Sequence, residues 1–173
     1  QIPLKEGDVL SLDIGLKYKG VHSDSARTIV VGKPEIKLPI IEAAKSSFFK
    51  GLEKAVVNNK TGDVGFAIHK EILSYKDQHN RCKFKIFSSF QGHGIGLDLH
   101  EKPSIPNIGR KGTGVIFREG MSFCIEPVVI FSSSNVDYKL NQGVVQFITD
   151  DNKVSSHYEN HVFLGPNGPE VLT

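Results

Sequence analysis

Hydrophobic positions near the start of the chain form two short runs separated by a polar turn. Residues 8–16 and 21–31 are rich in Val, Ile, Leu and Thr, a composition typical of strands. The turn between them ends at Gly20. The pattern predicts two neighbouring strands joined as a hairpin.

Hydrophobic residues then recur at steps of three and four, the spacing of one helix face. In the segment 40–57 these positions are Ile41, Ala44, Phe48, Leu52 and Ala55. A second helix is expected to start at Thr61 and to end near Asn80, with its apolar face formed by Val64, Ile68, Ile72 and Tyr75.

From Arg81 onward the pattern changes to short apolar segments and loops. A glycine-rich stretch at 92–96 and a loop interrupted by prolines separate these segments, and three further strands are predicted at 121–131, 143–149 and 157–164. A strand pair followed by a helix pair and several strands predicts an α+β fold with a mainly antiparallel sheet in one domain.

The composition is ordinary for a globular protein of 173 residues, with 39% hydrophobic and 23% charged residues. The net charge of +2, with scattered lysines, gives no indication of a nucleic-acid or membrane partner. No apolar stretch approaches the ~20 residues that cross a bilayer. Cys82 and Cys124 form no disulfide framework or zinc pattern and lie in apolar contexts, which predicts buried free thiols and a cytoplasmic protein.

Two aspartates stand inside or beside the first two apolar runs. Asp13 lies in the segment 9–15, and Asp24 follows 11 residues later, across the turn. In a hairpin, both carboxylates can lie on one face, and a buried carboxylate must pair with a cation or bind a metal because isolated burial is very costly. The alternative is that Asp24 belongs to a turn and Asp13 pairs with Arg27 or a lysine.

A glycine-rich string surrounds the candidate ligand His93. Glycines at positions 92, 94 and 96 let the backbone pack tightly and leave space for a ligand. His100 follows seven residues later, so that one histidine can bind a metal while the other hydrogen-bonds a substrate. A lone His-Gly pair is more often a surface turn, and only the complete string favours a site.

Glu126 and Glu159 each lie within a β-like apolar segment. Inward-pointing glutamates on strands are unusual unless they pair with a cation or coordinate a metal, although a single one more often faces water at a strand edge. Together with Asp13, Asp24 and His93 they form an oxygen-rich donor set. Such a set suits two divalent transition ions that share bridging carboxylates and a bridging water.

Several strings together closely resemble type I methionine aminopeptidases, which have the pita-bread (creatinase/aminopeptidase) fold. Besides the two aspartates, the resemblance rests on Leu4–Asp8, Gly92–Gly96, His100–Pro103, Gly120–Pro127, Tyr158–Glu159 and Gly168–Thr173. It implies an α+β fold whose mainly antiparallel, curved sheet is covered by helices. It also implies a single metallopeptidase catalytic domain over residues 1–173 that lacks the family's N-terminal portion, including a second catalytic histidine.

The resemblance assigns a role to each candidate metal ligand. Asp13 would chelate one ion, and Asp24 and Glu159 would bridge both ions. His93 and Glu126 would complete the coordination of the second ion. The two divalent ions could be Fe, Mn, Co or Zn, because the ligand types admit all four.

Catalysis and substrate binding are assigned by the same resemblance. Glu126 would carry a proton from water to the leaving amine, and His100 would contact the substrate amide and steady the tetrahedral intermediate. Leu99 and Val144 stand where the family usually has an aromatic residue and a tryptophan, so they are expected to give the substrate pocket a different shape. Asn160 stands where a histidine commonly follows the last glutamate.

The implied activity is hydrolysis of the N-terminal methionine from nascent proteins and peptides with a small second residue. The expected partners are nascent polypeptide N-termini, with association at the ribosome, and the protein is expected to be a monomer that needs no nucleic acid or membrane. Two alternatives on the same fold stay open. One is a proline-directed aminopeptidase P or prolidase, and the other is a non-catalytic pita-bread protein that binds a partner.

Overall fold

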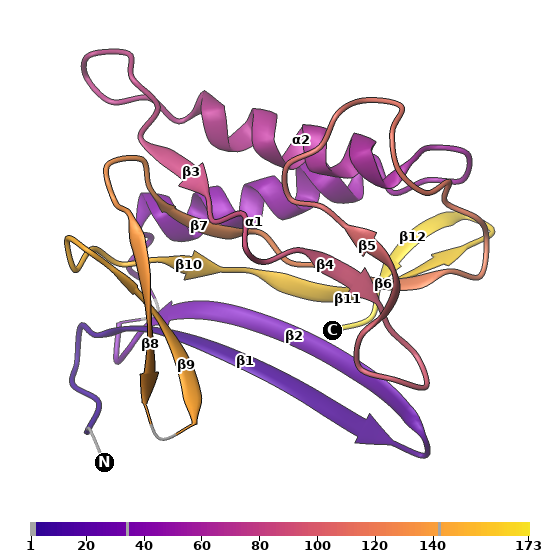
Figure 1. The fold of residues 1–173 in the computed structure, drawn as a ribbon, viewed down its shortest axis with the longest axis horizontal. Helices are drawn as coiled ribbons and strands as arrows, with labels where there is room; N and C mark the ends of the chain where they lie inside the picture. The colour runs from indigo at the N-terminus through magenta and orange to yellow at the C-terminus, as the bar shows by residue number, and fades with distance from the viewer. Residues whose placement is uncertain (1–2, 34, 142) are drawn as a thin grey trace.

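Antiparallel strands form most of the structure, which Figure 1 shows as a ribbon. The computed structural model describes residues 3–33, 35–141 and 143–173, apart from the side chains of Asn141 and Val144. Its largest sheet contains, in spatial order, β1 (Val9–Tyr18), β2 (Val21–Val30), β11 (Glu159–Gly165), β6 (Ser122–Ile125), β4 (Gly92–Gly94) and β5 (Glu101–Ile105), while β12 (Gly168–Val171) pairs with β11.

Two smaller sheets complete the strand arrangement. One contains β10 (Ser156–His157), β7 (Val128–Phe131) and β3 (Phe84–Ile86), and the other is a hairpin of β8 (Val136–Asn141) and β9 (Val144–Thr149). Each pairing between the described strands is antiparallel. The expected α+β class with a curved antiparallel sheet is therefore confirmed. The strands β4, β5 and β8 were not anticipated from the sequence, which predicted loops over the residues of β4 and β5.

Two helices, α1 (Pro39–Leu52) and α2 (Thr61–Ser74), lie side by side over one face of the strands (Figure 1). Their expected apolar faces are confirmed because those side chains enter the hydrophobic core. This core is continuous with the strands and includes Phe48, Val64, Ile68, Ile72, Phe84, Phe117, Phe123 and Ile125. The helices thus hold the strands that carry the candidate site residues.

Both helices end earlier than the periodicity indicates. Helix α1 ends at Leu52 rather than at residue 57, although Ala55 beyond it remains buried. Helix α2 ends at Ser74 because Tyr75 adopts an extended backbone, and its carbonyl accepts a hydrogen bond from the N–H of Lys83 (2.8 Å). The Tyr75 ring packs on Phe84 of β3. Pairing with a distant segment therefore ends α2 before its apolar pattern stops.

The predicted strands 121–131 and 157–164 are each divided between two sheets. The first divides at Glu126-Pro127 into β6 and β7, because proline has no N–H for the strand ladder. The second divides at Tyr158 into β10 and β11. After each division the chain continues in a different sheet, so Glu126 and Glu159 lie where the two sheets meet.

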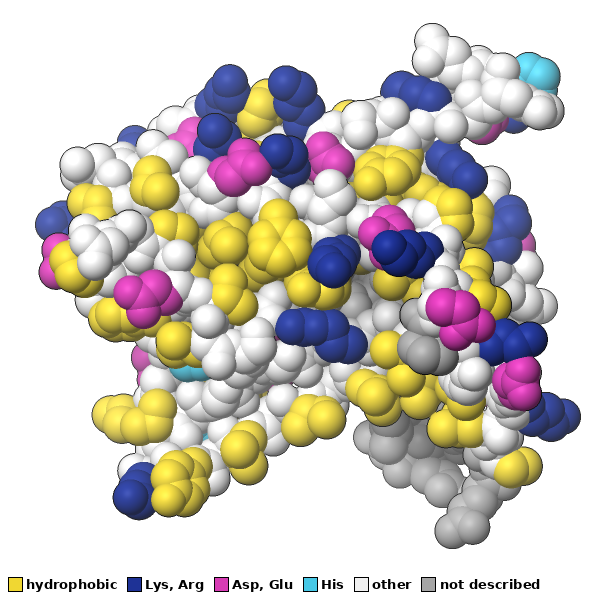
Figure 2. Space-filling model, turned by 180° about the vertical axis from the view of Figure 1, so that it is seen from behind, with side chains coloured by type: hydrophobic (Ala, Val, Ile, Leu, Met, Phe, Trp, Pro, Cys, Tyr) yellow, Lys and Arg dark blue, Asp and Glu magenta, His cyan; other side chains and the backbone are white. Residues whose placement is uncertain are grey.

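The hairpin of β1 and β2 closes through a two-residue turn at Lys19 and Gly20. Both residues have positive φ angles, 48° and 88°, which match the twist that tight hairpins need. Strand β1 lies at the edge of the sheet, and its outer side chains Leu12, Ile14 and Leu16 are exposed. Figure 2 shows hydrophobic side chains on this hairpin at the lower left.

Among the described residues, no helix is both long enough and apolar enough to cross a membrane. Cys124 is buried and free, as expected. The expectation of a buried thiol is wrong for Cys82, which is half-buried beside Lys76 because it lies in the loop that leaves α2.

Candidate metal centre

The register of the first hairpin brings two carboxylates to one face. Asp13 pairs with Ala26 and Asp24 pairs with Gly15, so the aspartates occupy diagonal positions on the same side. Asp24 is buried, and its Oδ1 accepts a hydrogen bond from the N–H of Ser25 (2.9 Å). The Asp13 side chain is 56% exposed. The expectation of a buried carboxylate is therefore correct for Asp24 and wrong for Asp13, because β1 is an edge strand.

The alternative pairing of Asp13 with Arg27 is wrong. The Arg27 guanidinium donates hydrogen bonds to the carbonyl of Glu159 and to Oδ1 of Asn160, and it lies 4.3 Å from the centre of the Tyr158 ring. Because side chains alternate along a strand, Arg27 lies on the face of β2 opposite Asp24. Asn160 therefore supports the fold through Arg27.

Glu126 and Glu159 reach the same space from the junctions between the sheets. Both side chains are buried, with 9% and 2% exposed. Glu159 opens β11, whose register pairs it with Ala26, next to Asp24 along β2. Asn107 holds the backbone at Glu126, because its Nδ2 donates a hydrogen bond to the Glu126 carbonyl (3.0 Å).

His93 enters from β4 and faces three of these carboxylates. Its Nε2 lies 3.9 Å from Asp24 Oδ2, 3.7 Å from Glu126 Oε1 and 3.9 Å from Glu159 Oε1. The other ring nitrogen, Nδ1, lies 2.9 Å from the Gly94 carbonyl and donates to it when protonated. That hydrogen bond leaves Nε2 with a free lone pair toward the carboxylates, which is the arrangement of a metal-binding histidine.

The residues converge on a cavity of ≈ 320 Å³, which is also lined by Phe90, Gln91 and Ser104. Its walls include all five candidate ligands, Asp13, Asp24, His93, Glu126 and Glu159, together with His100. The His100 ring is exposed and packs edge-to-face against His93, with 4.3 Å between ring centres. His100 therefore lies at the open side of the cavity, where a substrate can reach it.

The two expected pocket residues are placed differently. Leu99 lies against Gly15 of β1, because a Cβ built on that glycine would be 3.3 Å from Leu99 Cδ1, and it is not among the residues that line the cavity. Val144 begins β9, but its side chain lies outside the described part of the chain. From the same strand, the ring of Phe147 packs against Phe90, with 5.3 Å between ring centres.

Sequence reasoning missed two features of this site. The first is His157, whose ring lies among Asp13, Glu126 and Glu159. Its position two residues before Glu159, in an alternating strand, was a signal that could have indicated it. The second is the aromatic wall of Phe90 and Phe147, for which no local pattern exists because the two residues are far apart in sequence.

The electrostatics of the cavity favour a bound cation. Burial and the neighbouring carboxylates of Glu126 and Asp24 raise the pKa of Glu159 to about 9. Burial also raises the pKa of the adjacent Cys124 thiol, with Glu159 adding to the effect, so that thiol is protonated at neutral pH. Within residues 3–33, 35–141 and 143–173, no lysine or arginine forms an ion pair with the four carboxylates.

The donor set itself fits divalent transition ions. Carboxylate oxygens and imidazole nitrogens are ligands for such ions, and both are present here within one cluster. The Nε2 atom of His157 is buried without a hydrogen-bond partner in the described structure, which an ion would supply. The residues therefore fit a metal centre.

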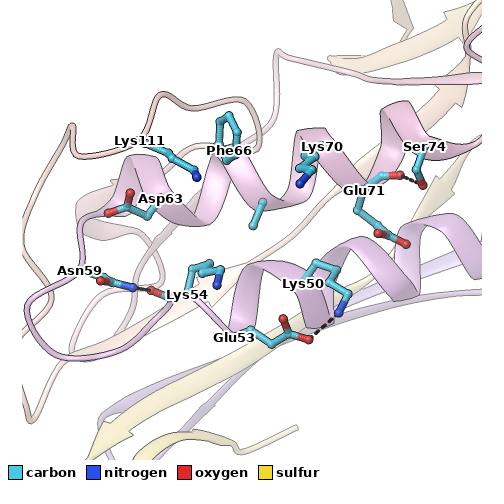
Figure 3. A pocket seen from close by; sticks show the side chains of 11 residues that line it. Lys50, Glu53, Lys54, Asn59, Asp63, Phe66, Lys70, Glu71, Ser74 and Lys111 are labelled. Atoms are coloured by element: carbon cyan, nitrogen blue, oxygen red, sulfur yellow. Dashed lines mark hydrogen bonds and ion pairs between the residues drawn. The ribbon is translucent and has the colours of Figure 1, made fainter.

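A larger hollow of ≈ 590 Å³ lies elsewhere, between α1 and α2 (Figure 3). Its walls carry side chains of both charges, among them Lys50, Lys54, Lys70, Glu53 and Glu71. Lys50 and Glu53 neutralise each other at 2.7 Å, and both are exposed. A mixed, solvated surface of this kind is common on helices, so this hollow gives no indication of chemistry.

Comparison with known proteins identifies the family. The sequence model of metallopeptidase family M24 matches residues 1–164. The chain belongs to this family. Membership in M24 agrees with the cluster of possible metal ligands, and the two together support binding of divalent metal by this chain.

Similar proteins and solved structures are consistent with this family and fold. The chain is 43% identical over 171 residues to a methionine aminopeptidase of Clostridium perfringens, covering 98% of the chain and 65% of that protein. It superposes on the crystal structure of methionine aminopeptidase from Rickettsia prowazekii with a TM-score of 0.80 at 31% identity, covering 98% of the chain and 66% of that structure. A prolidase from Pyrococcus furiosus shares the fold, with a TM-score of 0.69 at 24% identity. The match covers 97% of this chain and 42% of the prolidase.

The M24 chain described here thus spans about two thirds of the length of the relatives it matches. The pita-bread fold of these relatives confirms the resemblance and the fold class inferred from the sequence.

Proposed function

We propose that this protein is a dinuclear-metal aminopeptidase that removes the N-terminal methionine from nascent proteins and peptides with a small second residue. The observation that carries the proposal is the convergence of Asp13, Asp24, His93, Glu126 and Glu159 on one cavity. The name shared by the relatives from Clostridium perfringens and Rickettsia prowazekii supports the choice of substrate.

The proposed number of ions follows from charge. Four carboxylates line the cavity without a lysine or arginine partner among the described residues, and two divalent ions would balance them. Asp13 would bind one ion, called here the Asp13-side ion. His93 and Glu126 would bind the other, the His93-side ion, and Asp24 and Glu159 would bridge both. Fe, Mn, Co and Zn all accept this ligand set.

When bound, such ions supply Lewis acidity, because they polarise a carbonyl and lower the pKa of bound water. Glu126 is then the base that takes a proton from water and returns it to the leaving amine. Its buried position and the 3.7 Å between its Oε1 and His93 Nε2 support this role. His100, at the open side of the cavity, donates a hydrogen bond to the oxygen that becomes negative in the tetrahedral intermediate.

The substrate enters with its free amino group first. A free α-amino group would fill a ligand position on the bound ions, which a blocked N-terminus cannot fill because its nitrogen has no available lone pair. Phe90, with Phe147 packed against it, offers an apolar, aromatic wall beside the cluster. Thioethers pack favourably on such rings, which suits a methionine side chain. The cognate partners are then nascent polypeptide N-termini in the cytoplasm, met at the ribosome by a monomeric enzyme.

The test is a hydrolysis assay on the protein with Met-Ala-Ser and an X-Pro dipeptide, supplied in turn with Fe(II), Mn(II), Co(II) and Zn(II). We expect cleavage of Met-Ala-Ser and no cleavage of the X-Pro dipeptide. Asp24→Asn and Glu159→Gln should each abolish hydrolysis and reduce the metal bound in calorimetric titration, because each removes a bridging ligand. Glu53→Gln, which removes an exposed carboxylate from α1, is the control and should change neither quantity.

Two results would contradict the proposal. Preference for the X-Pro dipeptide would make the protein a proline-directed relative of aminopeptidase P or prolidase. Absence of divalent-metal binding at Asp24 and Glu159 would make it a non-catalytic protein of the same fold.

A further inference from the structure

The imidazole of His157 has no role in the ligand set proposed above, although it lies among the same carboxylates. Its backbone is fixed by Thr28 of β2, whose Oγ1 accepts a hydrogen bond from the His157 N–H (2.8 Å) and donates one to the His157 carbonyl (3.1 Å). Strand β10 also pairs His157 with Val128 of β7. Both sheets therefore fix the position of this residue.

The ring of His157 is buried and directed into the cluster. Only 11% of its side chain is exposed, and its Nε2 atom has no hydrogen-bond partner among the described residues. A buried polar atom without a partner is costly. An apolar side chain would suit hydrophobic packing at this position better than a histidine. The buried Nε2 atom without a partner therefore indicates that this nitrogen binds something.

The distances show that His157 mirrors His93 across the two glutamates. His157 Nε2 lies 3.5 Å from Glu126 Oε2 and 3.9 Å from Glu159 Oε2. His93 Nε2 lies 3.7 Å from Glu126 Oε1 and 3.9 Å from Glu159 Oε1. In both glutamates, Oε1 thus faces His93 and Oε2 faces His157. The remaining nitrogen of His157, Nδ1, lies 3.8 Å from Asp13 Oδ2.

These separations are close to those between ligands of a shared ion. Two atoms bound to one ion at ~2.1 Å lie roughly 3.0–3.6 Å apart for bond angles between 90° and 120°. Of the separations around His157 Nε2, 3.5 Å lies within this range and 3.9 Å slightly beyond it, whereas those around His93 Nε2, 3.7 and 3.9 Å, all lie slightly beyond it. Asp13, His157 and Glu159 form a compact group of possible ligands, as do Asp24, His93, Cys124 and Glu159.

We propose that His157 Nε2 is a ligand of the Asp13-side ion, so that each of the two ions has one imidazole. The inference rests on the two-ion site proposed above and adds a sixth protein ligand to it. The Nδ1 atom then carries the ring proton on the side of Asp13. Imidazole favours Zn, Co and Fe over Mg and Ca, so the Asp13-side position is a site for a transition ion.

The first experiment uses the unaltered protein loaded with two equivalents of Co(II). In the proton NMR spectrum, an imidazole bound to Co(II) gives a strongly shifted ring N–H signal that disappears in D₂O. We expect two such signals, from His93 and His157. A single signal with two Co(II) ions bound would overturn the role of His157 and leave the dinuclear site standing. Failure to bind any Co(II) would instead overturn the proposed function.

The second experiment compares His157→Gln with the unaltered protein by calorimetric Co(II) titration. The variant should lose one shifted N–H signal and bind its weaker ion at least about tenfold less tightly, since even residues behind the ligands change affinity 10–100-fold. Glutamine keeps the polarity and approximate length of the side chain, and far-ultraviolet circular dichroism checks that the variant is folded. Unchanged affinities and signals in a folded variant would refute the proposal.

The matched control is His79→Gln. His79 is exposed in the loop between α2 and β3, and the only hydrogen-bond partner of its ring among the described residues is the Gln78 side chain. This control removes one imidazole that could bind Co(II) weakly at the surface. It should retain both shifted signals and both affinities, and an equal loss of affinity in this variant would refute a specific role for His157.

Discussion

The close approach of β4 and β5 at Gly94 leads to a measurable consequence for His93. A Cβ atom built on Gly94 would lie 2.7 Å from the carbonyl carbon of Lys102 and closer still to its oxygen. Because the obstacle is backbone, no side chain can move aside, and Gly94→Ala requires the two strands to separate by roughly 1 Å. The Gly94 carbonyl is also the partner of His93 Nδ1, so the ring moves with it.

The expected cost follows from this overlap. Inserting a methyl group into a well-packed site typically destabilises a protein by ~1–3 kcal/mol. For a chain of this length, each kcal/mol lowers the melting temperature by about 2–4 °C, so Gly94→Ala should lower it by about 2–12 °C. Displacement of His93 should also weaken binding of the His93-side ion by about tenfold or more, as for other changes around a ligand.

The measurements are thermal unfolding without metal and calorimetric Co(II) titration. Gly96→Ala is the matched control, since a Cβ there would meet only the Glu101 carboxylate at 3.2 Å, and that flexible side chain can move. The control should change the melting temperature by less than about 2 °C. Equal melting temperatures and equal Co(II) affinities for the two variants would refute the inference that tight backbone packing positions His93.

Three further predictions concern other parts of the protein. His100→Ala should lower kcat by about 10²–10⁴-fold with the metal stoichiometry unchanged, because this ring is assigned to the substrate rather than to an ion; loss of one ion would contradict that assignment. Phe147→Ala should raise KM for Met-Ala-Ser with little change in kcat, since it removes part of the apolar wall at Phe90 and no reacting group, and an unchanged KM would exclude that wall from the substrate site. Hydrogen bonds from the N–H groups of Gly112 and Lys60 lower the pKa of Asp63 below its ordinary 3.8, so its stabilising contribution is present above that pH and is lost as the pH falls through the lowered pKa. Asp63→Ala should therefore lower the free energy of unfolding at neutral pH by about 1 kcal/mol, and a difference from wild type that persists below the lowered pKa in urea titrations would contradict the carboxylate's role.

Local pattern indicated the first hairpin, both helices and most of the candidate ligands. The Val, Ile, Leu and Thr content of 8–16 and 21–31, with a polar turn between them, predicted the first hairpin, and side-chain direction in a strand repeats every two residues. The same rule explains why Asp13 and Asp24 share a face once the turn at Lys19 and Gly20 sets the register. The glycines around His93 indicated a close backbone approach, and the structure shows what they approach.

Tertiary structure decided where those elements end and how the site is assembled. Periodicity extends α2 toward Asn80, whereas pairing of Tyr75 with the β3 region ends it at Ser74. The segment 121–131 is predicted as one strand, yet the chain passes from one sheet to another at Pro127 and leaves Glu126 at the junction. Propensity describes a segment by itself and contains no information about its partner strand.

His157 shows the same limit for the candidate site. In the sequence its spacing of two residues from Glu159 is the one local signal, and that spacing does not show which side chains the ring meets. Its contacts with Asp13 and Glu126 span more than 140 and 30 positions along the chain and exist only because β10 lies between β2 and β7. Residue type and local spacing determined the chemistry available to this protein, whereas sheet topology decided which side chains meet, because long-range contacts depend on how the strands pair.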